Sequence, residues 1–326
     1  DEDDLTARLK SNVDKWQKMA GIGDAQFCEI VAADEIDILV DLSGHTAHNR
    51  LTMFSRKPAP VQVTWLGYCC TSGLAAIDYI LADPYVIPPS DENYYVETPW
   101  RLPGTWMSFS QPNVDVAVEN LPALKNGYVT FGSFNNLSKM TDATIECWAG
   151  ILQAIPDSRL LLKSKPLAND LAQEKIYSAF QERGVDRRRL TLKSFSPDKA
   201  SHLGTYNEVD IALDTFPYSG ATTSIEAFWM GVPVLSLQGD KFISHMGESF
   251  LHNLDLEQWI ARSPEDYVEK AVAMASDLSM LSTLRQGLRN RLLQSQICNA
   301  PLFVENLEKA FREMWRIWCD KKNPAH

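Results

Sequence analysis

The sequence predicts an α/β protein made of two Rossmann-like lobes that face a cleft. From residue 128 to residue 237, short aliphatic and β-branched runs alternate with longer helix-like stretches, as in parallel βαβ units with helices on both faces. A chain of 326 residues exceeds one ordinary core and suits two lobes of roughly 150 residues each. Hydrophobic residues make up 45% and charged residues 22%, which is the balance of an ordinary globular protein.

The first lobe is expected to span residues 1–110. A helix-like stretch around 25–33 precedes three predicted strands, at 36–40, 61–66 and 77–81. A less regular, proline-rich segment from 84 to 122 follows, and we interpret it as the linker between the lobes. Because three strands would leave a sheet edge bare, this lobe is expected to be incomplete and to need residues that precede Asp1.

The second lobe, expected over residues 111–300, alternates regularly. Its predicted elements are strand 128–133, helix 141–155, strand 159–163, helix 167–183, strand 190–195, helix 198–206, strand 209–214, helix 222–230 and strand 232–237. The C-terminal segment 301–326 carries a final helix at about 301–318. One apolar stripe of that helix predicts a core-facing surface: Phe303, Leu307, Ala310, Phe311, Met314 and Trp318.

Composition and charge exclude several classes of protein. The net charge of −11 disfavours a non-specific nucleic-acid binder. No apolar run approaches the ~20 residues that span a bilayer, and no secretory signal opens the chain, so a cytoplasmic protein is expected. The six cysteines lack C-x-x-C spacing, which disfavours zinc sites and disulfide frameworks. No 34-residue repeat is visible.

The segment 209–234 is the strongest functional signal. A buried strand ends near Asp214, and the chain then turns through Gly220 into a helix that starts near Thr222 and Thr223. Unpaired N–H groups and the positive end of the helix dipole favour an anion at such a turn, as in nucleotide-binding folds. Glu226 has two interpretations, because it also completes an S/T-x-x-E capping box with Thr223.

Two further loops are expected at the same edge of the second sheet. Lys139 lies just past the strand at 128–133, where a lysine acts as a point charge on a diphosphate. Lys199 and His202 lie three residues apart on the helix at 198–206, so one side chain could reach a phosphate and the other could stack on a base. The alternative is that all three are ordinary solvated side chains.

The first lobe offers candidate catalytic groups directly after its strand at 36–40. Residues 41–50 include Asp41, His45, His48 and Arg50, which supply acid, base and anion-binding groups. The H-x-x-H pair has no third ligand, so no metal site is expected. The motifs typical of NTPases, dehydrogenases and serine hydrolases are missing. Two lobes with phosphate-binding groups and no metal motif favour a glycosyltransferase.

Four ordered motifs carry a resemblance to a known family. Residues 41–50 (DLSGHTAHNR), 56–68 (RKPAPVQVTWLGY), 134–139 (FNNLSK) and 214–233 (DTFPYSGATT to GVP) resemble the catalytic region of glycosyltransferase family 41, in its bacterial-like branch. This family contains protein O-GlcNAc transferases and SPINDLY-type O-fucosyltransferases. The resemblance covers nearly the whole chain. It implies a GT-B fold, metal-independent inverting transfer to serine and threonine of intracellular proteins, and upstream tetratricopeptide repeats.

The resemblance also implies roles for individual residues. It places Lys139 on the donor diphosphate with Asn136 beside it, and Glu226 on the ribose hydroxyls. It further implies residues beside the nucleotide and its phosphates: Lys199, His202, Thr222 and Thr223. Two positions depart from the O-GlcNAc transferases, since Ala221 replaces a histidine and Thr205 replaces an arginine.

The expected function is transfer of GlcNAc from UDP-GlcNAc to protein hydroxyls, with Asp41 or His45 as the base and no cofactor beyond the nucleotide sugar. GDP-fucose is the alternative donor, because Glu226 and the Ser-Gly-x-Thr-Thr pattern at 219–223 lean towards the SPINDLY-like and bacterial branch. A non-catalytic nucleotide-sugar or protein-binding module and a nucleotide-sugar epimerase are further alternatives.

Overall fold

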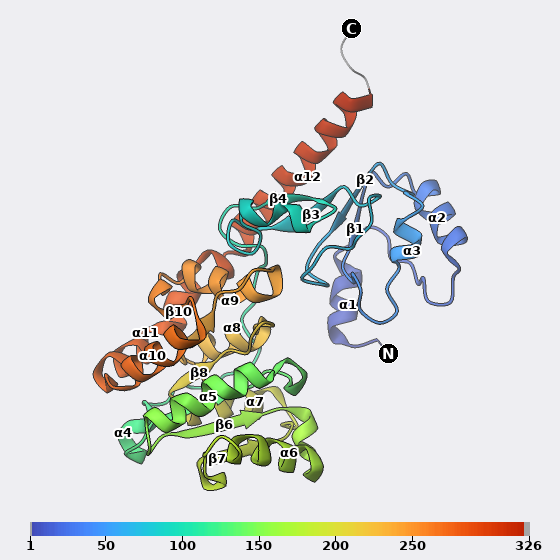
Figure 1. The fold of residues 1–326 in the computed structure, drawn as a ribbon. Helices are drawn as coiled ribbons and strands as arrows, with labels where there is room; N and C mark the ends of the chain where they lie inside the picture. The colour runs from blue at the N-terminus through green and yellow to red at the C-terminus, as the bar shows by residue number, and fades with distance from the viewer. Residues whose placement is uncertain (1, 323–326) are drawn as a thin grey trace.

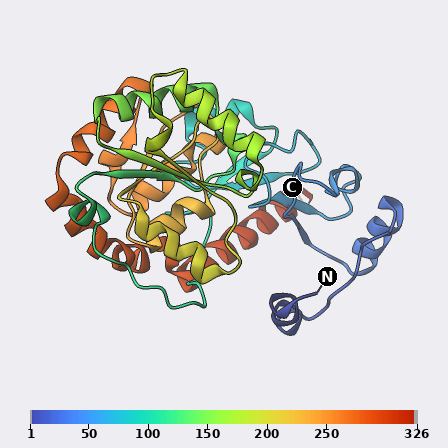
Figure 2. The same cartoon turned by 90° about the horizontal axis from the view of Figure 1, so that it is seen from below.

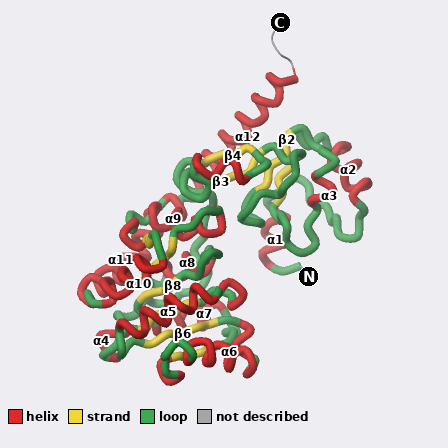
Figure 3. Tube along the Cα trace, in the orientation of Figure 1, coloured by secondary structure: helices red, strands yellow, loops and turns green. Residues whose placement is uncertain are grey.

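The computed structural model describes residues 2–322 and contains two parallel sheets, each flanked by helices (Figures 1 and 3). The first sheet has four strands in the order β1-β2-β3-β4, and the second has six in the order β10-β9-β8-β5-β6-β7. Every recorded strand pair is parallel. The prediction of an α/β protein with two Rossmann-like lobes is therefore confirmed.

The first lobe contains one strand more than the sequence predicts. Its elements are α1 (Asp4–Ser11), α2 (Asp24–Ala33), β1 (Ile38–Asp41), α3 (Leu51–Phe54), β2 (Val61–Thr64), β3 (Tyr79–Ala82), η1 (Pro89–Tyr94) and β4 (Thr98–Arg101). The unpredicted strand β4 contains Pro99 and forms an edge of the sheet. Proline is tolerated at a sheet edge because its missing N–H removes no bond from a central ladder, and this proline obscured the strand in the sequence.

The first part of the second lobe matches its predicted alternation. It runs through α4 (Pro122–Asn126), β5 (Thr130–Ser133), η2 (Leu137–Lys139), α5 (Asp142–Ala154), β6 (Arg159–Lys163), η3 (Lys165–Ala168), α6 (Asp170–Gln181), η4 (Arg187–Arg189), β7 (Leu190–Lys193), α7 (Lys199–Gly204), η5 (Thr205–Glu208), β8 (Ile211–Leu213), α8 (Thr222–Trp229) and β9 (Val234–Leu237).

Beyond residue 238 the structure contains elements that the sequence analysis did not assign. They are α9 (Phe242–Asn253), η6 (Glu257–Trp259), β10 (Ile260–Ala261), α10 (Pro264–Ala275), α11 (Leu278–Gln294) and η7 (Gln296–Cys298). The strand β10 has only two residues, too few to show a period in the sequence. No helix among the described residues is both long and apolar enough to cross a membrane.

The segment 84–122 is not a free linker. It contains β4 and η1, and Val86, Ile87 and Trp106 are buried in the core of the second lobe. The buried carboxylate of Asp83 accepts a hydrogen bond from Ser249 Oγ of α9 at 2.5 Å. The segment instead contributes side chains to both cores, since Leu102 is buried in that of the first lobe.

The last helix, α12 (Ala300–Lys322), packs on the sheet of the first lobe, although it follows the second lobe in sequence (Figure 1). Phe303, Ala310 and Met314 are buried against a cluster that includes Val61 and Val63 of β2. The predicted core-facing stripe is confirmed, and three further members of it are partly buried there: Leu307, Phe311 and Trp318.

The chain therefore crosses between the lobes twice, and the two crossings lie side by side. The Phe109 N–H donates to the Ile297 carbonyl at 2.8 Å. Gly104 has a φ of +82°, and a Cβ there would lie 2.0 Å from Gln296 Oε1. The Gly104 carbonyl in turn accepts from Asn253 Nδ2 at 2.8 Å. Figure 2 shows α12 passing from the second lobe towards the first.

Candidate functional site

A buried aspartate organises the turn at the carboxyl end of β8. Asp214 is 1% exposed, and its Oδ1 accepts from the Gly220 N–H at 2.6 Å and the Thr215 N–H at 3.0 Å. Its Oδ2 accepts from Ser236 Oγ at 3.0 Å. Burial raises the pKa of Asp214 to about 6, against the opposing effect of these hydrogen bonds and of Lys139. This carboxyl group fixes the path of the chain ahead of α8.

Asn135, which follows β5, connects this turn to the start of α8. Its Nδ2 donates to Asp214 Oδ1 and to Thr215 Oγ1, each at 3.0 Å. Its Oδ1 accepts from Thr223 Oγ1 at 2.6 Å. A Cβ on Gly220 would lie 2.9 Å from Asn135 Oδ1 and still closer to the hydroxyl of Thr223, at 2.6 Å, so only glycine fits without a shift. The hydroxyl-rich turn is thus a closely packed unit.

The amino end of α8 has the properties of an anion site. The helix begins at Thr222, and its N-cap residue Ala221 offers no side-chain acceptor. The first N–H groups of a helix have no intrahelical partner, and the helix dipole adds positive potential there. The capping-box interpretation of Glu226 is wrong, because Thr223 lies inside the helix and its hydroxyl donates to Asn135.

Lys139 reaches the same turn from η2. Its Nζ donates to the Ser219 carbonyl at 2.9 Å and lies 3.7 Å from the centroid of the Tyr218 ring. Burial lowers the pKa of Lys139, and Asp214 and Cys69 act in the opposite direction. The neighbouring Asn136 is exposed and caps η2, with its side chain accepting from a backbone N–H at 3.1 Å. The ammonium group of Lys139 therefore lies beside the turn that leads into α8.

Glu226 joins Lys199 and His202 into one polar cluster. The glutamate is 3% exposed, and its carboxylate accepts from Lys199 Nζ and contacts His202 Nε2 at 2.9 Å. Burial raises the pKa of Glu226, but the hydrogen bonds from His202 and Lys199 outweigh burial, so the net shift is downward. The side chain stays a carboxylate, one turn into α8 from the amino end of the helix.

Sequence reasoning missed three residues of this edge: Asn135, Lys163 and Asp214. Lys163 ends β6 and is 4% exposed, and its Nζ lies 3.1 Å from His202 Nδ1. A charged residue that ends an otherwise apolar buried strand is a usable signal, since the carboxyl ends of parallel strands meet at the ligand edge. That signal was present for both Lys163 and Asp214.

On the first lobe, Asp41 and His45 differ in their surroundings. Asp41 is 3% exposed and accepts from the N–H groups of Ser43 and Gly44 at 3.0 and 2.9 Å. His45 is exposed, and its Nε2 lies 3.0 Å from the Ser72 carbonyl. A carbonyl only accepts, so Nε2 of His45 carries a proton, and in a neutral ring Nδ1 is the nitrogen that would accept.

The loop after β2 brings the two lobes together. The ring of Tyr68 lies 5.3 Å from that of His45, and its neighbour Cys69 packs against the core of the second lobe. Burial raises the pKa of Tyr218, and the nearby Cys69 and Tyr68 raise it further. Tyr68, which lies beside His45, is therefore near Tyr218, which lies beside Lys139.

A metal site has no candidate among the residues that the structure describes. No group of three or more histidine, cysteine, aspartate or glutamate side chains there is placed to hold a metal ion. The six cysteines are free thiols.

Comparison with known proteins gives consistent matches. The model of glycosyl transferase family 41 matches residues 2–109 and 110–307. Two proteins named probable UDP-N-acetylglucosamine–peptide N-acetylglucosaminyltransferase SPINDLY, from Petunia hybrida and Arabidopsis thaliana, are each 39% identical over 327 residues. These matches cover 99% of this chain but only 35% and 36% of those proteins.

Among solved structures, a mutant of the Thermobaculum terrenum O-GlcNAc transferase matches with a TM-score of 0.91 and 39% identity. The match covers 99% of this chain and 61% of that one. This likeness confirms the GT-B fold expected from the resemblance. The chain spans about a third of the length of the curated relatives named above.

Proposed function

The chain belongs to glycosyl transferase family 41, and from this premise we propose that it is the catalytic region of a metal-independent, inverting protein glycosyltransferase. We propose UDP-GlcNAc as the donor and serine or threonine hydroxyls of proteins as acceptors. The observation that carries this proposal is the meeting of Lys139, the amino end of α8 and the Glu226 cluster at one sheet edge.

The donor diphosphate would lie between Lys139 and the first N–H groups of α8. Negative charge develops on the departing diphosphate during transfer, and fixed positive groups stabilise it most in the transition state. Lys139 and the helix end supply the positive charge that a divalent cation supplies in metal-dependent enzymes. Glu226 would accept from the ribose hydroxyls, with Lys199 and His202 beside the nucleotide and Asn136 near the phosphates.

His45 is the better placed of the two candidate bases. The carboxylate of Asp41 is buried and already accepts two backbone N–H groups, so we assign it to holding the loop. His45 has a free Nδ1 and is exposed on the lobe opposite Lys139. Inversion requires the acceptor to attack from the side away from the leaving group, and a base on the opposite lobe meets that requirement.

We predict that His45→Asn lowers kcat by about 100-fold, the lower range for loss of a general base, with little change in KM for the donor. The matched control is His48→Asn, because His48 is also exposed and its φ of +62° is one that asparagine tolerates. Steady-state rates with a protein acceptor measure both variants. If His45→Asn transferred sugar as fast as His48→Asn, His45 would not be the general base.

The proposed function is tested by incubating the enzyme and acceptor protein with radiolabelled UDP-GlcNAc and, separately, GDP-fucose. We expect label on the protein only from UDP-GlcNAc. Label only from GDP-fucose would establish the alternative donor, towards which Glu226 and the Ser-Gly-x-Thr-Thr pattern lean. Nucleotide binding without transfer would indicate a non-catalytic module, and free sugar product would indicate an epimerase.

Acceptor proteins are the partners that this proposal requires. We propose that the region belongs to a longer cytoplasmic protein and follows tetratricopeptide repeats; the greater length of the SPINDLY relatives supports only the longer protein. The net charge of −11 argues against a nucleic-acid partner.

A further inference from the structure

Lys163 is a buried cation whose three N–H groups all have partners. Its side chain is on the ligand edge of the second sheet, at the end of β6, and is 4% exposed. Nζ lies 3.1 Å from His202 Nδ1, 3.4 Å from the His202 carbonyl and 3.1 Å from Thr205 Oγ1. An ammonium group has three donors, and here it meets three acceptors. All three partners lie outside the sheet, on α7 and at the start of η5.

The neighbouring groups determine which atom donates in each hydrogen bond around Lys163 and His202. The only proton of Thr205 Oγ1 is donated to the Ser201 carbonyl at 2.9 Å, so this oxygen presents a lone pair to Lys163. The His202 carbonyl can only accept. Lys163 therefore donates, and Nδ1 of His202 accepts. Nε2 then carries the proton and donates to the carboxylate of Glu226 at 2.9 Å.

The imidazole is also held by its aromatic neighbours. The rings of Phe134 and Tyr206 each lie 6.0 Å from that of His202 in edge-on arrangements. Lys163 Nζ lies 5.4 Å from the centroid of the Phe134 ring. With both ring nitrogens engaged, the 29% of the His202 side chain that is exposed offers ring carbons and no free N–H.

We propose that Lys163 is a positioning residue of the nucleotide site: it fixes His202 as a neutral imidazole that offers its ring, and no hydrogen-bonding edge, to the base. The proposal rests on the nucleotide-diphosphate site proposed above. Stacking is tolerant of base identity because every base has a π-face. The His202 contact therefore supports uracil and guanine nucleotides alike, and discrimination between donors comes from other groups.

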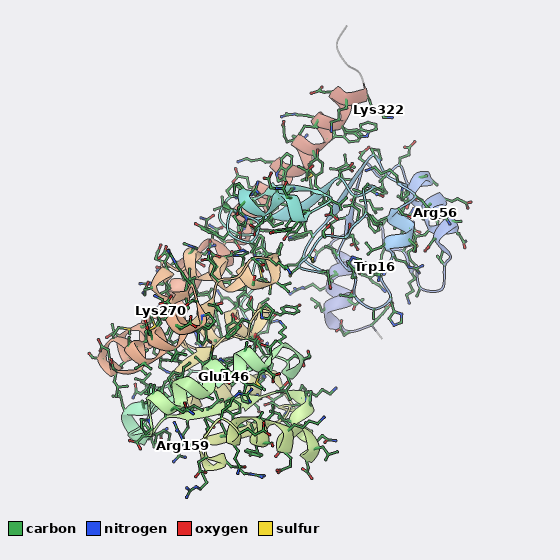
Figure 4. The ribbon with its side chains drawn as sticks, in the orientation of Figure 1. Trp16, Arg56, Glu146, Arg159, Lys270 and Lys322 are labelled. Atoms are coloured by element: carbon green, nitrogen blue, oxygen red, sulfur yellow. The ribbon has the colours of Figure 1, made fainter. Side chains whose placement is uncertain are left out.

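The test compares Lys163→Met with Arg159→Met. Arg159 begins the strand that Lys163 ends, is exposed, and lies at the far end of the second lobe (Figure 4). Imidazole ¹⁵N spectra report the tautomer of His202, and a His202→Gln variant assigns its signals. Calorimetric titration with UDP and with GDP gives the two Kd values, and thermal unfolding confirms that each variant is folded.

We expect a single Nε2–H tautomer in the unmodified protein and in Arg159→Met, and a mixture of tautomers in Lys163→Met. We expect Lys163→Met to raise both Kd values about tenfold, the size of one lost charge-assisted hydrogen bond, with their ratio unchanged. Lys163→Arg, which keeps a donor, should recover most of the affinity. An imidazolium or an Nδ1–H tautomer in the unmodified protein, or unchanged affinity in a folded Lys163→Met, would overturn the proposal.

Failure of the two proposals gives different results. Protein that binds UDP and shows the expected tautomer change, but transfers no sugar, contradicts the proposed function and leaves the role of Lys163 intact. Transfer at the unmodified rate in Lys163→Met, measured with the donor well below its Kd, contradicts only the role of Lys163. A Kd ratio between UDP and GDP that changes severalfold in Lys163→Met contradicts the tolerance for both bases.

Discussion

Replacing Lys139 by alanine is expected to lower kcat by about 100-fold while leaving the fold intact. The ammonium group lies 2.9 Å from the Ser219 carbonyl, beside the amino end of α8, where the diphosphate would gain charge. Loss of one such preorganised contact costs on the order of 3 kcal/mol in the barrier. Removing Lys139 breaks no direct salt bridge, because its direct contacts are a carbonyl and the Tyr218 ring.

The matched control for this variant is Lys175→Ala, which removes an exposed lysine from α6. Initial rates with labelled donor and circular dichroism should be compared for both variants. A Lys139→Ala enzyme that works within a fewfold of the unmodified rate would show that the diphosphate binds elsewhere.

Replacing Asp214 by alanine is expected to lower the free energy of unfolding by about 3–5 kcal/mol and to abolish transfer. The change leaves donors from Gly220, Thr215, Ser236 and Asn135 without their acceptor in a buried site. The turn ahead of α8 then loses the group that shapes it. Urea unfolding gives the stability, and a loss below 1 kcal/mol would show that other contacts fix the turn.

The pH dependence of stability offers a milder test of the same residue. Burial raises the pKa of Asp214 from 3.8 to about 6, so the folded state binds a proton more tightly than the unfolded state between these values. The contribution of Asp214 to stability therefore falls as pH rises from about 4 to about 6 and is then constant. Asp214→Asn cannot titrate, so the stability difference between the unmodified protein and this variant should follow that curve. A difference that is flat with pH would contradict the raised pKa.

Local sequence patterns predicted the parts of the fold where the pattern is long. The alternation from 128 to 237 gave correct strands and helices because each apolar run is bounded by turn residues. It failed for β4, where Pro99 interrupts the strand, and for β10, which has two residues. It also misassigned 84–122 as a linker, since burial of Trp106 by α9 depends on contacts distant in sequence.

The sequence predicts those features of the candidate site that follow from the strand topology alone. Placing Lys139, His202 and Glu226 at one edge needs only the rule that parallel strands end together. The particular partner of each group needed the structure. Glu226 contacts Lys199 and His202, and not the helix backbone as a capping box requires. Asp41 accepts hydrogen bonds from backbone N–H groups of the following turn, which no sequence pattern predicts. No role was predicted for Lys163, because it was taken only as the last residue of a buried strand.

The two adjacent crossings between the lobes limit how the lobes could move relative to each other. Segments near Phe109 and Ile297 are hydrogen-bonded to each other, so the lobes are joined at one place by two lengths of chain. A single connection would let one lobe twist freely about the other. A double connection of this kind resists torsion and favours rotation about one axis that passes through the crossings. His45 would then approach and leave the turn ahead of α8 along a fixed arc, and the alignment of the proposed acceptor and donor would be restored at each closure.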